Sequence, residues 1–310
     1  MYDTIIIGQG PAGITAAIYA ARREMKTLII GKEPGGQIIW AGEIENYPGF
    51  TSISNFELIS RFNEHALASG VEIKNAEVKN IEKRNDGSFL LTTERETFES
   101  KTVIIAMGLS PRRLAVPGEI ELSGKGVSYC ANCDGPLYKG KTVAVVGSGN
   151  SAFDAAEVLS KIASKVYLII RSATFKAFDS LVEEVKGRDN IEIITSAQTK
   201  EIKGENKVEA LIYQDESGGE ITLPLDGVFI EVGRIASTDL VDNLADRDER
   251  AQIIVDKKYS TRTPGLFAAG DVVAGEFKQI TIAMGQATEA ALYAYQYIQG
   301  AGTPPITTSK

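Results

Sequence analysis

The segment Tyr2–Gly13 reads YDTIIIGQGPAG and decides the first part of the fold. Its apolar, β-branched beginning predicts a buried strand, and the glycine-rich sequence GQGPAG follows directly. The Ala-rich stretch Ile14–Arg23 then predicts a helix. A strand, a glycine turn and a helix in this order are typical of a dinucleotide-binding unit. The glycines let a pyrophosphate approach backbone N–H groups at the helix N-terminus, where the helix dipole favours negative charge.

The same order returns in the middle of the chain. Thr142–Val146 predicts a strand, GSGNSA is the turn, and Phe153–Lys161 predicts a helix. Both units also end in an apolar strand that runs into a glycine, at Thr102–Gly108 and Gly227–Gly233. One GxGxxG motif is weak evidence, but two with the same flanks are hard to obtain by chance. The sequence therefore predicts an α/β fold with two Rossmann-like dinucleotide-binding domains of three layers (ββα).

The end of the chain predicts how these domains are connected. An apolar strand at Gly265–Asp271 and an Ala-rich helix at about Gln279–Gln299 have no unit of their own to complete. We expect them to return to the first unit, so that the second domain is inserted into the first. The expected boundaries are 1–112 with 245–310 for the first domain and 113–244 for the second. Within each domain, turn residues between short alternating segments predict an antiparallel meander.

Composition and charge exclude several classes of protein. The 310 residues are 43% hydrophobic and 24% charged, as in a globular protein, and their length suits two domains of about 150 residues. The net charge of −8 and the scattered basic residues argue against a nucleic-acid partner. No apolar run reaches the roughly 18 residues that a membrane span needs. The start Met1-Tyr2-Asp3 lacks the basic region of a secretory leader, so we expect a cytoplasmic location.

Two cysteines and one histidine limit the chemistry further. Cys130, Cys133 and His65 cannot supply the four ligands of a zinc site within the chain, so no metal is expected. His65 lies in a helical pattern, where a solvated or packing role is expected. The pair Cys130-Ala131-Asn132-Cys133 predicts a dithiol that cycles with a disulfide. Two inert core thiols, or half of an intermolecular metal site, remain the alternatives.

A dithiol and two nucleotide units together require an electron carrier between them. A nicotinamide gives up a hydride, whereas a disulfide is opened by thiolate attack or by two-electron reduction. Flavin accepts hydride and forms an adduct with a thiolate. The sequence therefore predicts FAD in one unit, a nicotinamide nucleotide in the other, and Cys130 with Cys133 as the exit for electrons.

Several further segments resemble one family along nearly the whole chain, the low-molecular-weight thioredoxin reductases, which are FAD-dependent pyridine nucleotide-disulfide oxidoreductases. The similar segments are GQGPAG at 8–13, PGGQ at 34–37, ENYPG at 45–49, CANCDG at 130–135, GSGNSA at 147–152, and GD at 270–271 with KQ at 278–279. The resemblance implies a thioredoxin-disulfide reductase that transfers electrons from NADPH through FAD and the cysteine pair to thioredoxin or a thioredoxin-like protein. It also implies a homodimer.

The resemblance implies a role for individual residues. Cys133 faces the flavin, Cys130 exchanges with the protein substrate, and the carboxylate of Asp134 takes part in proton transfer; Asp134 as a turn former is the alternative. Asp271 is expected on the ribityl chain, and Gln279 at the start of a helix facing the flavin ring. The expected FAD contacts are Gly8, Gly10, Pro11, Ala12, Gly13, Gly36, Gln37, Asn46, Gly270, Asp271, Lys278, Gln279 and Ile280. The expected contacts of the nicotinamide nucleotide are Gly147, Gly149, Asn150, Ser151, Ala152, Arg171, Lys176 and Gly233.

The sequence departs from the family at the site of the NADPH 2′-phosphate. Where the family has paired arginines, this chain has Arg171 followed by Ser172, and Lys176 replaces a third arginine. Each lost charge-assisted contact weakens a phosphate site by roughly 1.5–3 kcal/mol. The strand ending at Ile170 carries no acidic residue for an NADH ribose either. NADH, or a non-nicotinamide donor such as ferredoxin, is therefore the alternative to NADPH.

Other functions remain open at this point. The same fold serves a dithiol oxidase that runs in reverse with oxygen, and a nucleotide-binding redox sensor is the non-enzymatic alternative. A nicotinamide–ferredoxin oxidoreductase of similar architecture lacks a CxxC, which argues against that function. In the reductase mechanism, one cysteine meets the flavin and the other meets a bulky protein. We therefore expect the inserted domain to rotate about its two linkers.

Overall fold

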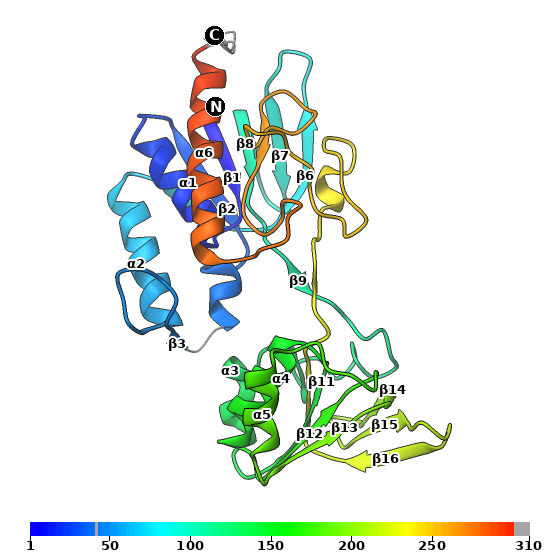
Figure 1. Ribbon diagram of the computed structural model, residues 1–310. Coiled ribbons are helices and arrows are strands. Elements are labelled where there is room, and N and C mark those ends of the chain that lie inside the picture. The colour runs from blue at the N-terminus through cyan, green and yellow to red at the C-terminus, as the bar shows by residue number, and fades with distance from the viewer. Residues whose placement is uncertain (41–42, 301–310) are drawn as a thin grey trace, which may run out of the picture. The chain divides into compact units, whose positions relative to one another are not determined.

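The computed structural model describes residues 1–40 and 43–300, and it divides the chain into two compact units (Figure 1). Unit 1 is Met1–Ser110 with Ile235–Lys310, and unit 2 is Pro111–Arg234. Residues 301–310, which the sequence analysis placed in the first domain, lie outside the described residues. Unit 2 is thus inserted into unit 1 along the chain.

Unit 1 is built on a seven-stranded sheet whose main path is β5-β2-β1-β8-β7-β6, with β19 also paired to β8. The strands β1, β2, β5, β8 and β19 pair in parallel, and β6 and β7 form the antiparallel meander with β8. The strands are β1 (Tyr2–Ile7), β2 (Thr27–Gly31), β5 (Glu72–Asn75), β6 (Val78–Lys83), β7 (Phe89–Thr93), β8 (Thr97–Ile105) and β19 (Leu266–Ala268). The helices are α1 (Pro11–Ala21), α2 (Asn55–Ala68), α6 (Ile280–Ile298) and the 3₁₀ helices η1 (Gly36–Trp40) and η3 (Asp239–Val241), and a small sheet pairs β3 (Glu43–Ile44) with β4 (Ile53–Ser54).

Alternating side chains of β1 divide the core of unit 1 into two layers. Ile6 packs with the alanines of α1 and α6 on one face of the sheet, and Ile5 and Ile7 pack with the meander on the other. Successive strand residues point to opposite faces, so this run of isoleucines fills both layers at once. All three side chains are at most 4% exposed. The result is the predicted order of meander, sheet and helices.

Unit 2 repeats this plan with a parallel five-stranded sheet in the order β10-β17-β11-β12-β13. Val143 and Val145 face the helices, and Ala144 and Val146 face a separate three-stranded meander, β14-β15-β16. The strands are β10 (Val127–Ser128), β11 (Thr142–Val146), β12 (Lys165–Ile169), β13 (Ile191–Ile194), β14 (Gln198–Lys203), β15 (Ala210–Gln214), β16 (Glu220–Pro224) and β17 (Gly227–Ile230). The helices are α3 (Ala131–Asp134), α4 (Asn150–Ser160), α5 (Asp179–Lys186) and the 3₁₀ helix η2 (Gly135–Tyr138). The predicted fold class, two Rossmann-like domains with the second inserted, is confirmed.

Helix starts differ from the sequence expectation. The helix α1 begins at Pro11, because Gly10 caps it and proline suits the first helical position, where no N–H bond is lost. Likewise α4 begins at Asn150, directly after Gly149. Both helices therefore start inside their glycine motifs, which brings their free N–H groups to the turn.

Strand β8 is one continuous strand that begins five residues before the apolar strand predicted from Thr102. Its first half pairs with β7 and its second half with β19, so one strand serves both the meander and the parallel sheet. In unit 2 the corresponding strands β16 and β17 are separate. There β10 pairs with β17, just as β19 pairs with β8 in unit 1. The sequence analysis did not predict β10, because a strand of two residues has no periodic pattern.

The two chain crossings pair with each other as β9 (Ser110–Pro111) and β18 (Arg234–Ile235). The second crossing therefore precedes the expected boundary, and residues 235–244 belong to unit 1. The reason is burial: Ala236 and Val241 are at most 4% exposed and pack in the meander-side core of unit 1. This segment is therefore anchored in unit 1 by its apolar side chains.

Candidate functional site

The cysteine pair lies at the carboxyl end of β10 and forms a disulfide, Cys130–Cys133. Cys130 is in extended conformation and caps α3, with its Sγ accepting a hydrogen bond from the backbone N of Cys133 at 3.0 Å. Cys130 is buried and Cys133 is exposed. After reduction, this N–H would stabilise negative charge on the sulfur of Cys130, which is how a helix start activates a thiol.

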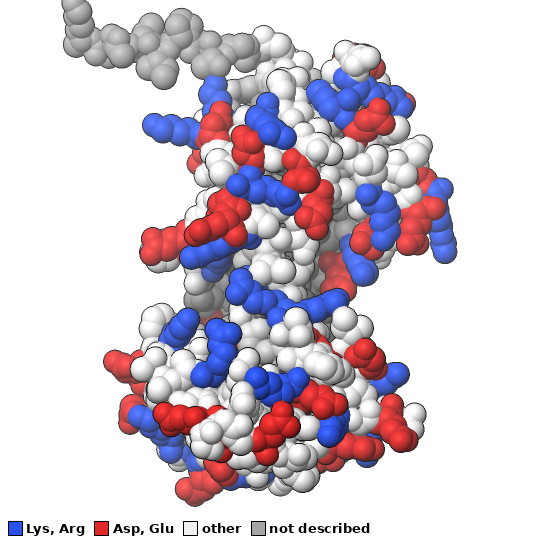
Figure 2. Space-filling model, turned by 90° about the vertical axis from the view of Figure 1, so that its right-hand side faces the viewer, with Lys and Arg blue, Asp and Glu red and all other residues white. Residues whose placement is uncertain are grey.

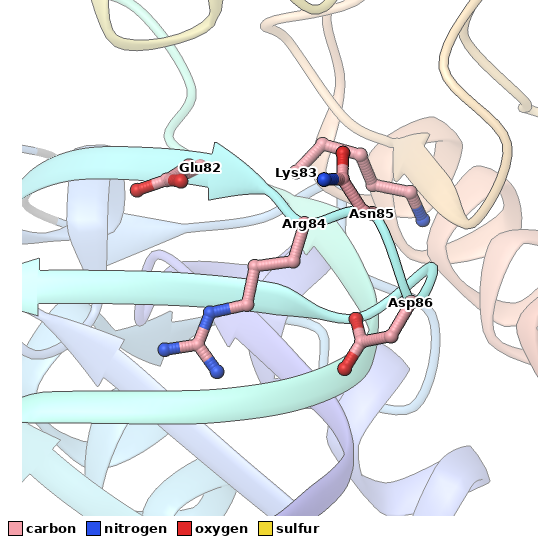
Figure 3. A pocket seen from close by; sticks show the side chains of 5 residues that line it. All are labelled: Glu82, Lys83, Arg84, Asn85 and Asp86. Atoms are coloured by element: carbon pink, nitrogen blue, oxygen red, sulfur yellow. The ribbon is translucent and has the colours of Figure 1, made fainter.

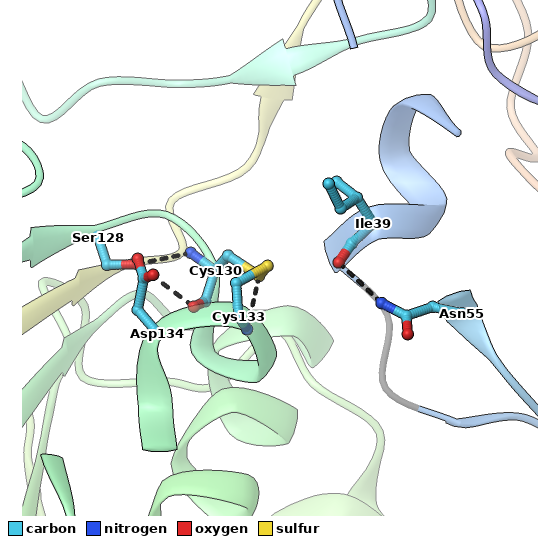
Figure 4. Close-up of a disulfide and its surroundings, with 6 residues drawn as sticks. All are labelled: Ile39, Asn55, Ser128, Cys130, Cys133 and Asp134. Carbon is cyan, nitrogen blue, oxygen red and sulfur yellow. Dashed lines mark hydrogen bonds between the residues drawn. A yellow bond between two sulfur atoms is a disulfide. The ribbon is translucent and has the colours of Figure 1, made fainter. Parts of the chain in front are cut away.

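Ser128 holds the carboxylate of Asp134 beside the backbone of Cys130 (Figure 4). The hydroxyl of Ser128 lies 2.6 Å from Oδ2 of Asp134 and accepts a hydrogen bond from the backbone N of Cys130 at 3.0 Å. Ser128 is buried, with 5% of its surface exposed. The structure thus brings together Cys130, Cys133 and Asp134, the three residues expected to be catalytic, and adds a serine that the sequence analysis missed.

A second buried contact supports the same segment. Glu119, only 1% exposed, accepts hydrogen bonds from the backbone N atoms of Leu114 and Ala115 at 3.0 and 2.7 Å and from the hydroxyl of Tyr129 at 2.7 Å. Burial and the bond to Glu119 raise the pKa of Tyr129. Three donors satisfy the buried carboxylate, which would otherwise be costly. Glu119 therefore ties the segment after the first crossing to the residue before Cys130.

The glycine turn of unit 2 follows the carboxyl end of β11. At this strand the sheet continues to β12 on one side and to β17 on the other. A dinucleotide binds at such a switch point of a parallel sheet. A Cβ on Gly147 would lie 2.2 Å from the carbonyl oxygen of Glu231, so only glycine fits there. A Cβ on Gly149 would meet nothing within 4 Å, which leaves the start of α4 open. The turn therefore has the shape that a pyrophosphate needs.

The segment that follows β12 is attached to this turn. The backbone N of Lys176 donates to the carbonyl oxygen of Ser148 at 2.7 Å, and the backbone N of Phe178 donates to Oδ1 of Asn150 at 2.9 Å. Arg171 and Lys176 are both exposed. Ser172 donates its hydroxyl to the carbonyl oxygen of Thr174 at 2.6 Å, so it closes a local turn.

Glu231 is a residue of this site that sequence reasoning missed. It directly follows β17 and donates its backbone N to the carbonyl oxygen of Val146 at 2.8 Å. Burial raises the pKa of Glu231 to about 7, with a contribution from the carboxylate of Asp154, and Arg234 opposes the rise. Partial desolvation and the nearby carboxylates of Glu157 and Glu184 likewise raise the pKa of Asp154. An isolated glutamate at the end of an apolar strand gave no signal in the sequence, because its burial depends on unit 2 as a whole.

The glycine turn of unit 1 is shaped by close backbone contacts. A Cβ on Gly8 would lie 2.2 Å from the carbonyl oxygen of Ala106, and a Cβ on Gly13 would lie 1.9 Å from that of Gly8. Gly8 also has a φ of +118°, which favours glycine. The turn therefore packs closely against the carboxyl ends of β1 and β8. The N-terminus of α1 then faces the carboxyl edge of the sheet, as a bound pyrophosphate requires.

Residues from distant parts of the sequence meet at this edge. A Cβ on Gly36 would lie 3.0 Å from Cα of Gly10, and Nε2 of Gln37 donates to Oδ2 of Asp271 at 2.8 Å. A Cβ on Gly270 would lie 2.8 Å from that of Ala12. The expected FAD contacts at 8–13, 36–37 and 270–271 are therefore neighbours.

The start of α6 supplies the remaining expected contacts. Asn46 donates to Oε1 of Gln279, which caps α6, at 3.3 Å, and Ile280 is the first residue of that helix. Lys278 donates to the carbonyl oxygen of Val273 at 2.6 Å, and burial lowers the pKa of Lys278. The lysine is thus engaged by the loop that precedes α6.

The side chain of Gln9 is hydrogen-bonded at the carboxyl end of β2. A dinucleotide-binding unit usually has an acidic residue near this point, which binds the ribose. The side-chain nitrogen of Gln9 lies 3.0 Å from the carbonyl oxygen of Gly31, 3.2 Å from that of Lys74 and 2.9 Å from Oδ1 of Asn75. Glu33, the nearest carboxylate in the sequence, is exposed. Sequence reasoning missed Gln9 because its partners lie 22 to 66 residues away.

A hollow at the turn between β6 and β7 is lined by residues of that one hairpin (Figure 3), which are Glu82, Lys83, Arg84, Asn85 and Asp86. Acidic and basic side chains are interspersed over the face seen in Figure 2. The described residues hold no cluster of three His, Cys, Asp or Glu suited to a metal ion. His65 is exposed. None of the described helices is long and apolar enough to cross a membrane.

Comparison with known proteins supports these observations. A family model described as pyridine nucleotide-disulphide oxidoreductase matches residues 2–287. A protein of Bacillus subtilis named NADH dehydrogenase is 38% identical over 300 residues, which are 96% of this chain and 58% of that protein. The chain thus spans little more than half of that curated relative.

Solved structures match over nearly the whole chain. The thioredoxin reductase of Lactococcus lactis, described as the FR conformation, superposes with a TM-score of 0.90 at 37% identity, covering 97% of this chain and 100% of that one. That of T. acidophilum has a TM-score of 0.87 at 40% identity, with 97% and 99% covered. The resemblance seen in the sequence is therefore confirmed in three dimensions.

Proposed function

Because the chain belongs to the pyridine nucleotide-disulphide oxidoreductase family, we propose that it is a thioredoxin-disulfide reductase. Family membership implies a flavin and a nicotinamide cofactor. The observation that carries the proposal is the Cys130–Cys133 disulfide at the end of β10, in a unit that also holds a dinucleotide-type glycine turn. The second glycine turn, in unit 1, brings the start of α1 to the carboxyl edge of the sheet, where a flavin nucleotide would bind.

The residues at the edge of unit 1 fit FAD. Gly8, Gly10 and Gly13 with Pro11 and Ala12 bring backbone N–H groups to the pyrophosphate, because no side chain at the glycines blocks its approach. The linked side chains of Gln37 and Asp271, beside Gly36 and Gly270, offer hydrogen bonds to the ribityl chain and ring. Asn46, Lys278, Gln279 and Ile280 surround the start of α6, whose dipole favours negative charge on the ring.

The turn of unit 2 fits the nicotinamide nucleotide. Gly147, Gly149, Asn150, Ser151 and Ala152 form the proposed pyrophosphate site at α4, with Gly233 in the segment that follows the neighbouring strand β17. The donor proposed is NADPH, since Arg171 and Lys176 are exposed beside the turn and can contact a 2′-phosphate. NADH is the second candidate donor. It is favoured because the hydroxyl of Ser172, which stands where the family has an arginine, is bound within its own turn. The relative named NADH dehydrogenase also supports this donor.

The cysteine pair passes two electrons to a protein disulfide. Bound flavin would take hydride from the nicotinamide and supply two electrons to the disulfide. The Cys130 thiolate then attacks the partner's disulfide, whose departing sulfur takes a proton, and a mixed disulfide forms. Cys133 attacks Cys130, the second partner sulfur leaves and is protonated, and the Cys130–Cys133 bond is restored. Asp134 moves the proton in this exchange.

Further parts of the proposal concern the partner and the motion. The partner is thioredoxin or a thioredoxin-like protein, and the compartment is the cytoplasm, where thiols are kept reduced. Since Cys133 must meet the flavin and Cys130 a protein, the inserted unit is proposed to rotate about its crossings β9 and β18. The homodimer stays a prediction.

An anaerobic titration of the flavin-loaded protein with NADPH, and separately with NADH, tests the proposal. Bleaching of the flavin with either donor, followed by recovery on addition of oxidised thioredoxin, is the expected result. Cys130→Ser and Cys133→Ser should still bleach but lose thioredoxin turnover. Absence of bleaching with both nucleotides would exclude the nicotinamide-fed reductase. Full turnover in either cysteine variant would exclude the dithiol route.

A further inference from the structure

The hydroxyl of Ser128 occupies a position that links the two functional groups of the dithiol segment. Ser128 is the last residue of β10, the edge strand beside β17, where it pairs with Phe229. Only 5% of its surface is exposed. A buried hydroxyl needs partners, and this one finds them in residues 130 and 134.

The geometry indicates where the hydroxyl proton lies. Two acceptors compete for it: Oδ2 of Asp134 at 2.6 Å and the carbonyl oxygen of Cys130 at 3.3 Å. A serine has one proton to donate, and the shorter distance is typical of a bond to a carboxylate. The proton is therefore directed to Asp134. The oxygen of Ser128 still accepts the N–H of Cys130 at 3.0 Å.

The start of α3 places Asp134 against the backbone of Cys130. The backbone N of Asp134 donates to the carbonyl oxygen of Cys130 at 3.1 Å, so the two residues are one helical turn apart. One oxygen atom, that of Ser128, thus fixes both the backbone of Cys130 and the side chain of Asp134 (Figure 4). Without it, the aspartate could rotate away into solvent, since its side chain is only partly buried.

We propose that Ser128 is a positioning residue for proton transfer at the dithiol, because it holds the carboxylate of Asp134 beside Cys130. This rests on the proposed function only through the role of Asp134 in exchange. In the exchange step, an incoming thiolate attacks the disulfide, the Cys130–Cys133 bond breaks, one new S–S bond forms, and the departing sulfur takes a proton. Ser128 acts by holding the group that delivers this proton, and it exchanges no proton with sulfur itself.

The test measures how fast dithiothreitol opens the disulfide in the full-length, flavin-loaded protein, by alkylation of the new thiols and mass spectrometry. This reaction needs neither nucleotide nor thioredoxin, so it reports on Ser128 even if thioredoxin is not the substrate. Asp134→Asn is expected to slow opening about a hundredfold, as loss of acid–base catalysis does. Ser128→Ala is expected to slow it about tenfold, and Ser128→Thr, which keeps the hydroxyl, much less. Ser160→Ala, which removes a serine hydrogen bond at the end of α4, is the matched control.

A double-mutant cycle separates positioning from mere structural support. If Ser128 acts through Asp134, Ser128→Ala adds no further slowing to Asp134→Asn. Equal slowing by Ser128→Ala in both backgrounds, or no slowing at all, would overturn the proposal. Asp134→Glu gives a test that does not depend on the folding of the serine variants. This substitution keeps the carboxylic acid but displaces it relative to the hydroxyl of Ser128. A rate of disulfide opening equal to that of the unaltered protein would also refute the positioning role.

Discussion

Replacing Glu231 by glutamine should stabilise the protein at alkaline pH and have little effect at acidic pH. The carboxyl group of Glu231 follows β17 and is largely desolvated, and its pKa is raised from 4.5 to about 7. A group whose pKa is higher in the folded state loses its proton first in the unfolded state as pH rises. Ionisation then favours the unfolded chain, so the side chain costs stability progressively between about pH 4.5 and pH 7.

The size of the effect follows from the shift. Each pH unit in this window costs about 1.4 kcal/mol, so the whole interval amounts to about 3 kcal/mol. Glutamine has the same shape and never ionises. Glu231→Gln should therefore gain about 3 kcal/mol relative to the unaltered protein on going from about pH 4 to about pH 8. This is a large part of the stability of a typical domain.

Urea denaturation followed by circular dichroism across this pH range measures the difference between the two proteins. Hydrogen exchange of peptides that contain β11 and β17 then assigns the change to unit 2. Glu216→Gln removes the same charge from an exposed turn and controls for net charge. A stability difference between Glu231→Gln and the unaltered protein that does not grow with pH would refute the reasoning.

Three further changes test other parts of the structure. Gly13→Ala places a Cβ 1.9 Å from the carbonyl oxygen of Gly8, so we expect the purified protein to carry little flavin, and a normal flavin content would contradict the proposed FAD site. Tyr129→Phe removes one donor from the buried carboxylate of Glu119 and should lower the free energy of unfolding by about 1–3 kcal/mol, measured by urea denaturation; an unchanged midpoint would show that the bond is dispensable. Arg171→Ala should raise KM for NADPH about tenfold and leave KM for NADH unchanged, and equal effects on both donors would place the 2′-phosphate elsewhere.

The sequence alone was sufficient for the features that depend on neighbouring residues. The turns at Gly8–Gly13 and Gly147–Ala152 could be predicted because a strand, a glycine turn and a helix are consecutive in the chain. The pair Cys130 and Cys133 was visible because two residues separate the cysteines, which suits a disulfide within one helical turn. The insertion of one domain into the other followed from the apolar strand and long helix left over at the end of the chain.

The tertiary structure decided the features that depend on distant partners. Gln9 closes the ends of strands that are remote in sequence. Glu119 is buried where Tyr129 and the backbone of the segment after β9 donate to its carboxylate. Glu231 titrates near neutral pH because the surrounding unit removes water from it. Ser128 takes its place from β10, a strand too short to predict, whose pairing with β17 aligns the hydroxyl with Asp134. Desolvation and non-local hydrogen bonds arise only when the whole unit is folded. For that reason no local pattern in the sequence could predict them.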